Sequence, residues 1–244
     1  MTSCVSAPDF RQGTRCASVI DMPAPDVILA GLTAISNEWR SLAIAWHIAF
    51  GLAIVAISAG WRPSERAIAG VLTVPLVSVS LLASQSGNPF NSAVFALLAV
   101  VLTIVAATLP AQVIRVASRR VLIPGGLLLL FGCVYPHFVT AQSWTPYLYA
   151  SPLGLIPCPT LATLIGVSLA LGLFRSMRWS TPLAIAGIVY GVIGVFRLDV
   201  VIDYALLAGA VALAAISATV TVCRRSDAVS RVWPAHGSAV SSRF

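Results

Sequence analysis

The stretch "IPCPTLATLIGVSLALGLF", from Ile156 to Phe174, contains no charged residue and opens with a cysteine between two prolines. Its length is close to the roughly 20 residues that an apolar helix needs to cross the hydrocarbon core of a bilayer. The whole chain of 244 residues has the same character, because 58% of it is hydrophobic and only 9% is charged. Soluble domains carry charge on about a quarter of their residues, so the composition predicts a polytopic membrane protein.

Six further stretches repeat this pattern and, with the first, predict an all-α bundle of seven transmembrane helices. In chain order, the predicted spans are Ser41–Gly60, Ala67–Ser84, Ser92–Val113, Leu122–Val139, Ile156–Phe174, Thr181–Phe196 and Tyr204–Val222. No connection between them is long enough to fold by itself, so residues 41–222 are predicted to form one membrane domain.

The two ends of the chain differ from this domain in composition. Residues 1–40 are predicted to be an extracytoplasmic segment, in which residues 24–37 form a short interfacial helix that lies on the outer face. Residues 223–244 are rich in serine, alanine and arginine, and we predict a disordered cytoplasmic tail.

Arginine, which supplies all 15 basic residues, is distributed unevenly between the predicted connections. Nine arginines follow the odd-numbered spans, namely Arg62, Arg66, Arg115, Arg119, Arg120, Arg175, Arg178, Arg224 and Arg225. The opposite connections contain only Arg197, which has Asp199 and Asp203 beside it. By the positive-inside rule, the amino terminus is predicted to lie outside and the carboxyl terminus in the cytoplasm.

Several proline-bearing motifs resemble a known family. They are Tyr135-Pro136, Pro157-Cys158-Pro159-Thr160, Asn88-Pro89 within "GNPFNSAVFALL", and Asp203-Tyr204. Together they resemble the bacterial integral membrane proteins of domain of unknown function family 6064, over roughly residues 22–222. The chain departs from the family pattern in having Leu161 instead of a second threonine, and in an amino-terminal extension. The resemblance implies that Met22 is the natural start and that the chain lies in the bacterial cytoplasmic (inner) membrane. It implies no particular activity.

Cys158 is the first candidate site. The prolines on both sides favour a cap position at the start of a helix, where the helix dipole stabilises a thiolate. Cys133 and His137 are spaced i, i+4 and would share a helical face nearby. Two sulfurs and an imidazole suit a soft metal ion, whereas the two cysteines alone could form a disulfide. Buried structural use of both thiols is the third alternative.

Polar residues elsewhere in the chain also allow both a functional and a structural interpretation. Arg197, Asp199 and Asp203 are predicted at the outer junction of the last two spans, either as a site where a cation or proton enters or as an internal ion pair. His47 is predicted inside the hydrocarbon, where an imidazole either serves function or bonds a neighbouring helix. Gly187, Gly191 and Gly194 share one face and predict a packing seam within the chain.

The residues that start helices form a separate group. Pro157, Pro159 and Thr160 open the fifth predicted span, and Asn88 with Pro89 opens the third. Proline in a first turn costs no hydrogen bond, and asparagine is a good cap.

No nucleotide-binding, metalloprotease or hydrolase motif occurs in the chain, and no haem or iron–sulfur spacing is visible. The sequence therefore favours a non-enzymatic, permease-like or sensor-like module with a thiol or soft-metal site at its outer face. The alternatives are an intramembrane thiol-redox enzyme and a non-catalytic subunit of a larger membrane complex. The predicted partner is the lipid bilayer, and no nucleic acid partner is predicted. Association with a second copy of the chain or with other membrane subunits is an alternative that the sequence leaves open. The sequence names no cofactor and no ligand.

Overall fold

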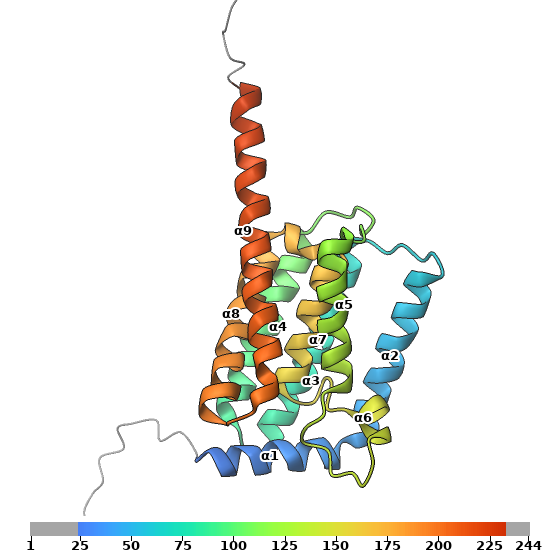
Figure 1. Cartoon of the computed structure of the whole chain (residues 1–244), viewed down its shortest axis with the longest axis vertical. Helices are drawn as coiled ribbons and strands as arrows, with labels where there is room; N and C mark the ends of the chain where they lie inside the picture. Colours follow the sequence, from blue (N-terminus) through green and yellow to red (C-terminus); the bar gives the residue numbers. More distant parts are fainter. Residues whose placement is uncertain (1–23, 233–244) are drawn as a thin grey trace, which may run out of the picture.

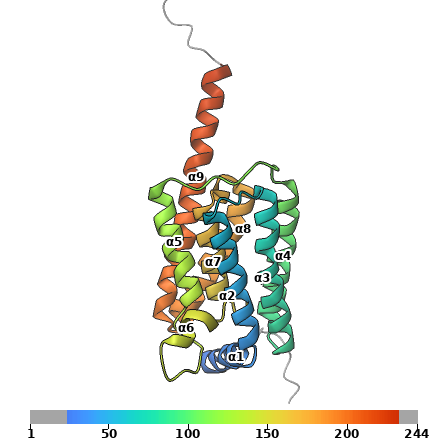
Figure 2. The ribbon, with the colours of Figure 1, turned by 90° about the vertical axis from the view of Figure 1, so that its right-hand side faces the viewer.

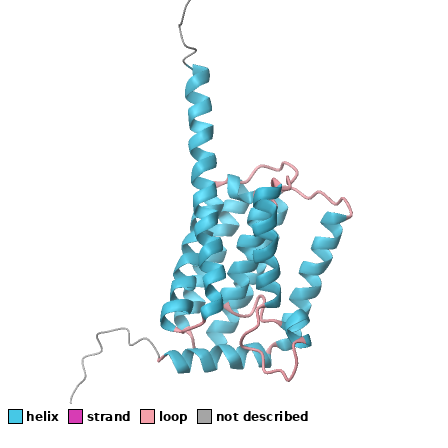
Figure 3. Ribbon diagram, viewed as in Figure 1, coloured by secondary structure: helices cyan, strands magenta, loops and turns pink. Residues whose placement is uncertain are grey.

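The computed structural model describes residues 24–232, and within that range the chain is helical with no strand element (Figure 1 and Figure 3). The helices are α1 (Pro25–Glu38), α2 (Arg40–Ser58), α3 (Glu65–Gln85), α4 (Pro89–Thr108), α5 (Arg119–Val134), α6 (Thr145–Ala150), α7 (Pro157–Ala170), α8 (Met177–Val192) and α9 (Tyr204–Val232). A π-helical turn, Ile193–Arg197, extends α8, and short 3-10 turns cover Leu173–Arg175 and Val201–Asp203. The predicted all-α class is confirmed.

Five helices of the described part are long and apolar enough to cross a bilayer. They are α2, α3, α4, α8 with its π-helical turn, and the segment Val201–Cys223, which joins a 3-10 turn to most of α9. The remaining predicted spans correspond to α5 and α7, which have only 16 and 14 residues. A helix of 14 residues rises about 21 Å, less than the ~30 Å of a hydrocarbon core. Length and composition therefore support five spans, and the count of seven stays a prediction.

Prolines end two helices earlier than the hydrophobic pattern predicts. The third predicted span closes as α4, because Leu109 precedes Pro110 and takes an extended conformation with ψ of 151°. The fourth closes as α5 at Val134, directly before the Tyr135-Pro136 pair. The apolar residues that follow each helix continue the run in the sequence but belong to loops.

Helix α7 lies at the centre of the bundle, and all 14 of its residues are buried. It has contacts with α3, α5, α8 and α9, as Figure 1 and Figure 2 show. Glycines let α5 approach it closely: a Cβ placed on Gly125 would lie 2.8 Å from the Leu169 Cβ, and one on Gly132 would lie 2.7 Å from the Pro159 carbonyl oxygen. Small residues at such crossings are typical of membrane helix packing.

The predicted glycine seam on α8 is confirmed and faces α9. A Cβ on Gly187 would lie 2.8 Å from the Ala210 Cβ, and one on Gly191 would lie 3.0 Å from the Leu207 Cα. The two helices therefore pack within one chain, as the sequence predicts.

Helix α1 lies across one end of the bundle (Figure 1) and matches the short helix predicted over residues 24–37. Leu32 and Ile35 are buried on its inner side. Asn37 ties it to the loop after α5, because its amide donates to the Phe138 carbonyl over 3.1 Å and accepts from the Thr140 N–H over 2.9 Å. These contacts make α1 a cover for this end.

Helix α9 continues to Val232, so a helix replaces the predicted disorder over residues 223–232. The rest of the predicted tail, residues 233–244, lies outside the described residues. So do residues 1–23, and with them the hypothesis that the natural chain starts at Met22.

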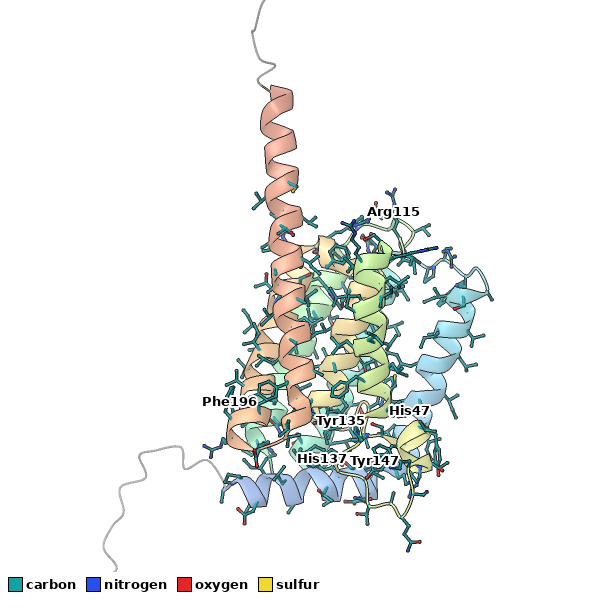
Figure 4. The ribbon with its side chains drawn as sticks, in the orientation of Figure 1. His47, Arg115, Tyr135, His137, Tyr147 and Phe196 are labelled. Atoms are coloured by element: carbon teal, nitrogen blue, oxygen red, sulfur yellow. The ribbon has the colours of Figure 1, made fainter. Side chains whose placement is uncertain are left out.

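The two ends of the bundle differ in charge. Of the arginine side chains that the structure describes, those at the end opposite α1 are Arg62, Arg66, Arg115, Arg119, Arg120, Arg175 and Arg178. Only Arg40 and Arg197 of that set lie at the end covered by α1. Figure 4 marks the contrast, with Arg115 at one end and Tyr135, His137 and Tyr147 at the other. The alternation predicted for the connections is present in the fold, and we refer to the two ends as the arginine end and the α1 end.

Candidate functional site

The α1 end contains three buried polar residues that come from different segments: Tyr135, Cys158 and Asp203. Only 1% of Asp203 and none of Tyr135 is exposed. The Tyr135 hydroxyl donates to Asp203 Oδ1 over 2.7 Å, and the Cys158 thiol is a second hydrogen-bond partner of this carboxyl group. A carboxyl group is costly to bury unless it is hydrogen-bonded. These two bonds therefore account for its place in the core, and we refer to the three residues as the Asp203 cluster.

The cluster forms where three helix ends meet. Tyr135 directly follows α5, Cys158 is the second residue of α7, and Asp203 directly precedes α9. Space for the carboxyl group comes from Gly194, since a Cβ there would collide with the Asp203 Oδ2. Glycine at this position is thus a packing requirement of the site.

A cavity of about 80 Å³ adjoins the cluster on the side of α1. Most of its wall is apolar, and Ile28 and Leu32 of α1 contribute to it. Its polar lining residues are Asn88, Asn91, Cys158, Tyr190 and Arg197. A water needs only about 10–15 Å³ measured in this way, so the α1-end cavity has room for several waters or one small molecule.

Two of these polar residues are fixed by a hydrogen bond between helices. The Tyr190 hydroxyl of α8 donates to Asn91 Oδ1 of α4 over 2.9 Å. The Tyr190 ring also packs edge to face on Phe95, with 5.3 Å between ring centroids. Both Asn91 and Tyr190 are buried, so the polar groups that they present are held in place before any ligand arrives.

Two groups in the loop after α5 have shifted proton affinities. Burial, reinforced by the neighbouring Cys158 and Asp203, raises the pKa of the Tyr135 hydroxyl far above its ordinary value. Tyr135 therefore stays a neutral hydrogen-bond donor to Asp203. Partial burial lowers the pKa of His137, which favours the neutral imidazole.

The predicted trio of Cys133, His137 and Cys158 does not assemble as a metal site. Because α5 ends at Val134, His137 lies in a loop, and its i, i+4 relation to Cys133 on one helical face is wrong. No group of three histidine, cysteine or acidic side chains able to hold a metal ion occurs among the described residues. Cys133 and Cys158 are both free thiols, so the predicted disulfide is also absent. Cys158 is in the first turn of α7, and the cap position belongs to Ile156.

The predicted cluster of Arg197, Asp199 and Asp203 is divided by the backbone. Asp199 has a positive φ of 55° and is exposed, whereas Asp203 is the last residue of a 3-10 turn and is buried in the core. The two carboxyl groups therefore do not share a helical face, which corrects the i, i+4 interpretation. Arg197 lines the α1-end cavity.

His47 lies between two helices. Its Nδ1 is 2.8 Å from the Ala43 carbonyl oxygen of α2, and its Nε2 is 2.6 Å from the Cys133 carbonyl oxygen at the end of α5. A neutral ring donates to one of these carbonyls and an imidazolium donates to both. The geometry matches the prediction that this imidazole bonds a neighbouring helix.

The helix-start residues have the predicted roles. Asn88 caps α4, where its side chain accepts from the Asn91 N–H over 3.0 Å, and Pro89 follows in the first turn. Pro157 and Pro159 both lie in the first turn of α7. Buried Thr160 donates to the Ile156 carbonyl over 2.7 Å and accepts from the Gly154 N–H over 2.9 Å, and these bonds fix the turn before the helix.

Sequence reasoning did not identify Tyr135, Asn91 or Tyr190 as site residues. Tyr135 and Asn91 appeared only as parts of motifs that start or end helices, and Tyr190 lies inside an apolar span. A tyrosine within a membrane span, away from the headgroup level, is itself a signal, because its hydroxyl needs a partner when it is buried.

Comparison of the chain with protein-family models, with curated proteins and with solved structures finds no match. The resemblance to family 6064 therefore stays a prediction.

Proposed function

We propose that the protein is a seven-helix binding module of the permease or sensor type in the bacterial inner membrane. In this proposal α5 and α7 complete the crossing within the bundle, the arginine end faces the cytoplasm, and the α1-end cavity opens toward the outside. Support for seven crossings comes from the alternation of the arginine-bearing connections. Residues that flank a short helix can extend its path to the interface.

The α1-end cavity carries the functional part of the proposal. It combines apolar walls with amide, hydroxyl and guanidinium groups, a combination typical of ligand sites. Its size fits a small molecule, and the donors of Asn88, Asn91 and Arg197 suit oxygen acceptors such as a carboxylate. The proposed ligand class is therefore a small polar molecule that bears oxygen atoms.

Binding is favoured over thiol chemistry by the surroundings of Cys158. Its side chain is buried and bonded to Asp203, whereas reactive thiols are partly exposed and lie in electropositive surroundings. The described residues contain no group of histidine, cysteine or acidic side chains that would support the soft-metal version.

The proposal is tested by thermal unfolding of the detergent-solubilised chain against a panel of small carboxylates and polyols. A panel member that binds raises the unfolding temperature of the wild type, and Tyr190→Phe reduces this shift because it removes one hydroxyl from the cavity wall. Tyr147→Phe serves as the matched control, since the Tyr147 hydroxyl bonds the Val139 carbonyl outside the cavity. No shift with any panel member, or an equal shift in Tyr190→Phe, contradicts the proposal.

A further inference from the structure

Helix α2 stands apart from the other long helices, as Figure 1 shows. Only 6% of its apolar window is buried within the chain, against 56% for α3. The space between α2 and the bundle contains a cavity of about 250 Å³. Trp46, Phe50 and Ile57 line it from α2, and Leu72, Gly126 and Ala170 line it from α3, α5 and α7.

A second hollow of about 470 Å³ continues this space toward the α1 end. It is lined by His47, Gly51 and Cys133, and it shares Phe50 and Gly126 with the first cavity. The two hollows therefore form one crevice along the side of α2, which we call the α2 crevice.

The wall of the α2 crevice is almost entirely apolar. Apolar cavities of about 150 Å³ stay dry and take up apolar ligands. In a bilayer, the apolar material that surrounds such a crevice is the acyl chain of a lipid. The shape and lining of the crevice thus fit an acyl chain.

Arginines at one end of the crevice favour a lipid with an anionic headgroup. Exposed Arg62 lies in the loop after α2, and its guanidinium donates to the carbonyl of Ile57, a crevice-lining residue. Exposed Arg119 and Arg120 begin α5, just before the lining residue Leu122.

The same end of the crevice offers little negative charge to balance these arginines. The carboxyl group of Glu65 is buried and accepts a hydrogen bond from the Gln112 amide over 2.9 Å. Guanidinium groups bind phosphate oxygens with paired hydrogen bonds, so the arginine mouth of the crevice complements a phosphate group.

We propose that the α2 crevice holds an acyl chain of one anionic phospholipid, whose phosphate lies against Arg62, Arg119 and Arg120. The arginine mouth of this site lies at the opposite end from the α1-end cavity, and lipid occupancy does not depend on what that cavity binds.

Native mass spectrometry of the full chain, released from mixed micelles that contain equal amounts of phosphatidylglycerol and phosphatidylcholine, tests the site. The wild type is expected to retain one phosphatidylglycerol in preference to phosphatidylcholine. Removing each arginine charge in Arg62→Gln, Arg119→Gln and Arg120→Gln is expected to reduce that preference about fivefold. Arg178→Gln, at the start of α8, is the control that leaves it unchanged.

A second variant tests the crevice itself. Gly126 lines the crevice, and a Cβ placed on it meets nothing within 4 Å, so the side chain of Gly126→Leu would occupy crevice space and is expected to abolish lipid retention. Gly70 on α3 does not line the crevice, and a Cβ placed on it also meets nothing within 4 Å, so Gly70→Leu is expected to retain the lipid. Equal retention of both lipids by the wild type, or unchanged retention in Gly126→Leu, overturns the proposal. A lipid-free dimer also overturns it, because a helix of the second copy would then fill the crevice.

Discussion

At the scale of single residues, Gly194 determines whether the Asp203 carboxyl group can be buried. Gly194→Ala places a methyl group against that carboxyl group, and we expect a loss of about 1–3 kcal/mol in the free energy of unfolding. Thermal unfolding in detergent measures the effect. Gly70→Ala is the control, since a Cβ there meets no atom within 4 Å. Equal unfolding temperatures for the two variants would show that the cluster is not packed as described.

His137, in the loop after α5, gives the stability of the fold a predictable response to pH. Burial lowers the pKa of His137 in the folded chain below its ordinary value of 6.5, so the unfolded chain binds a proton more readily. The stability that this group contributes is complete above pH 6.5 and is lost as the pH falls toward the native pKa.

The wild type should therefore lose more thermal stability than His137→Gln when the pH is lowered from about 7.5 to about 5. Parallel unfolding scans of the two proteins make the comparison. An identical loss in both would mean that His137 has its ordinary proton affinity in the fold.

At the scale of helices, His47 is the contact that joins α2 to the end of α5. His47→Leu removes the imidazole, whose two nitrogens lie within hydrogen-bond distance of the Ala43 and Cys133 carbonyls, and the loss of one such hydrogen bond costs roughly 1 kcal/mol. Because α2 is otherwise weakly packed, its distance from α5 should become longer and more variable. Spin labels at the exposed positions Leu52 and Leu127 report this distance.

Ser41→Ala, at the exposed start of α2, is the control for that measurement. The same narrow distance distribution in His47→Leu and in the control would show that His47 does not hold the helix.

Helix positions followed from the sequence more reliably than helix ends did. The sequence predicted the apolar runs, the Asn88 cap and the glycine face of α8, because each of these features depends on residues that are close together in the chain. The ends of α4 and α5 were not, since the apolar pattern continues through the Pro110 and Pro136 regions while the backbone leaves the helix. Placing His137 on a helix followed directly from this error.

The same limit explains what could be predicted of the candidate site. Cys158 was identified as a candidate because prolines flank it at a predicted helix start, and Asp203 because Arg197 and Asp199 lie close to it in the sequence. Their hydrogen-bond partners were not identified, since the bond from Tyr135 to Asp203 joins residues 68 positions apart. That bond depends on how the ends of α5, α7 and α9 meet, and the spacing of residues along the chain does not predict it.

At the scale of the whole molecule, the fold separates a charged end from an end with a buried polar site. Arginines gather where α2 ends and α3, α5 and α8 begin, and the Asp203 cluster lies beneath α1 at the other end (Figure 1). By the positive-inside rule, this asymmetry predicts that the arginine end faces the cytoplasm. The proposed access of a ligand to the α1-end cavity from outside depends on that predicted orientation.

Labelling of single introduced cysteines in intact cells with a membrane-impermeant maleimide tests this claim most directly. Ser118 at the arginine end and Ser143 at the α1 end are both exposed, which makes them a matched pair, and the parent chain measures background from native thiols. The account predicts that Ser143→Cys is labelled in intact cells and that Ser118→Cys is labelled only after the membrane is permeabilised. Labelling of both positions from the same side would contradict it.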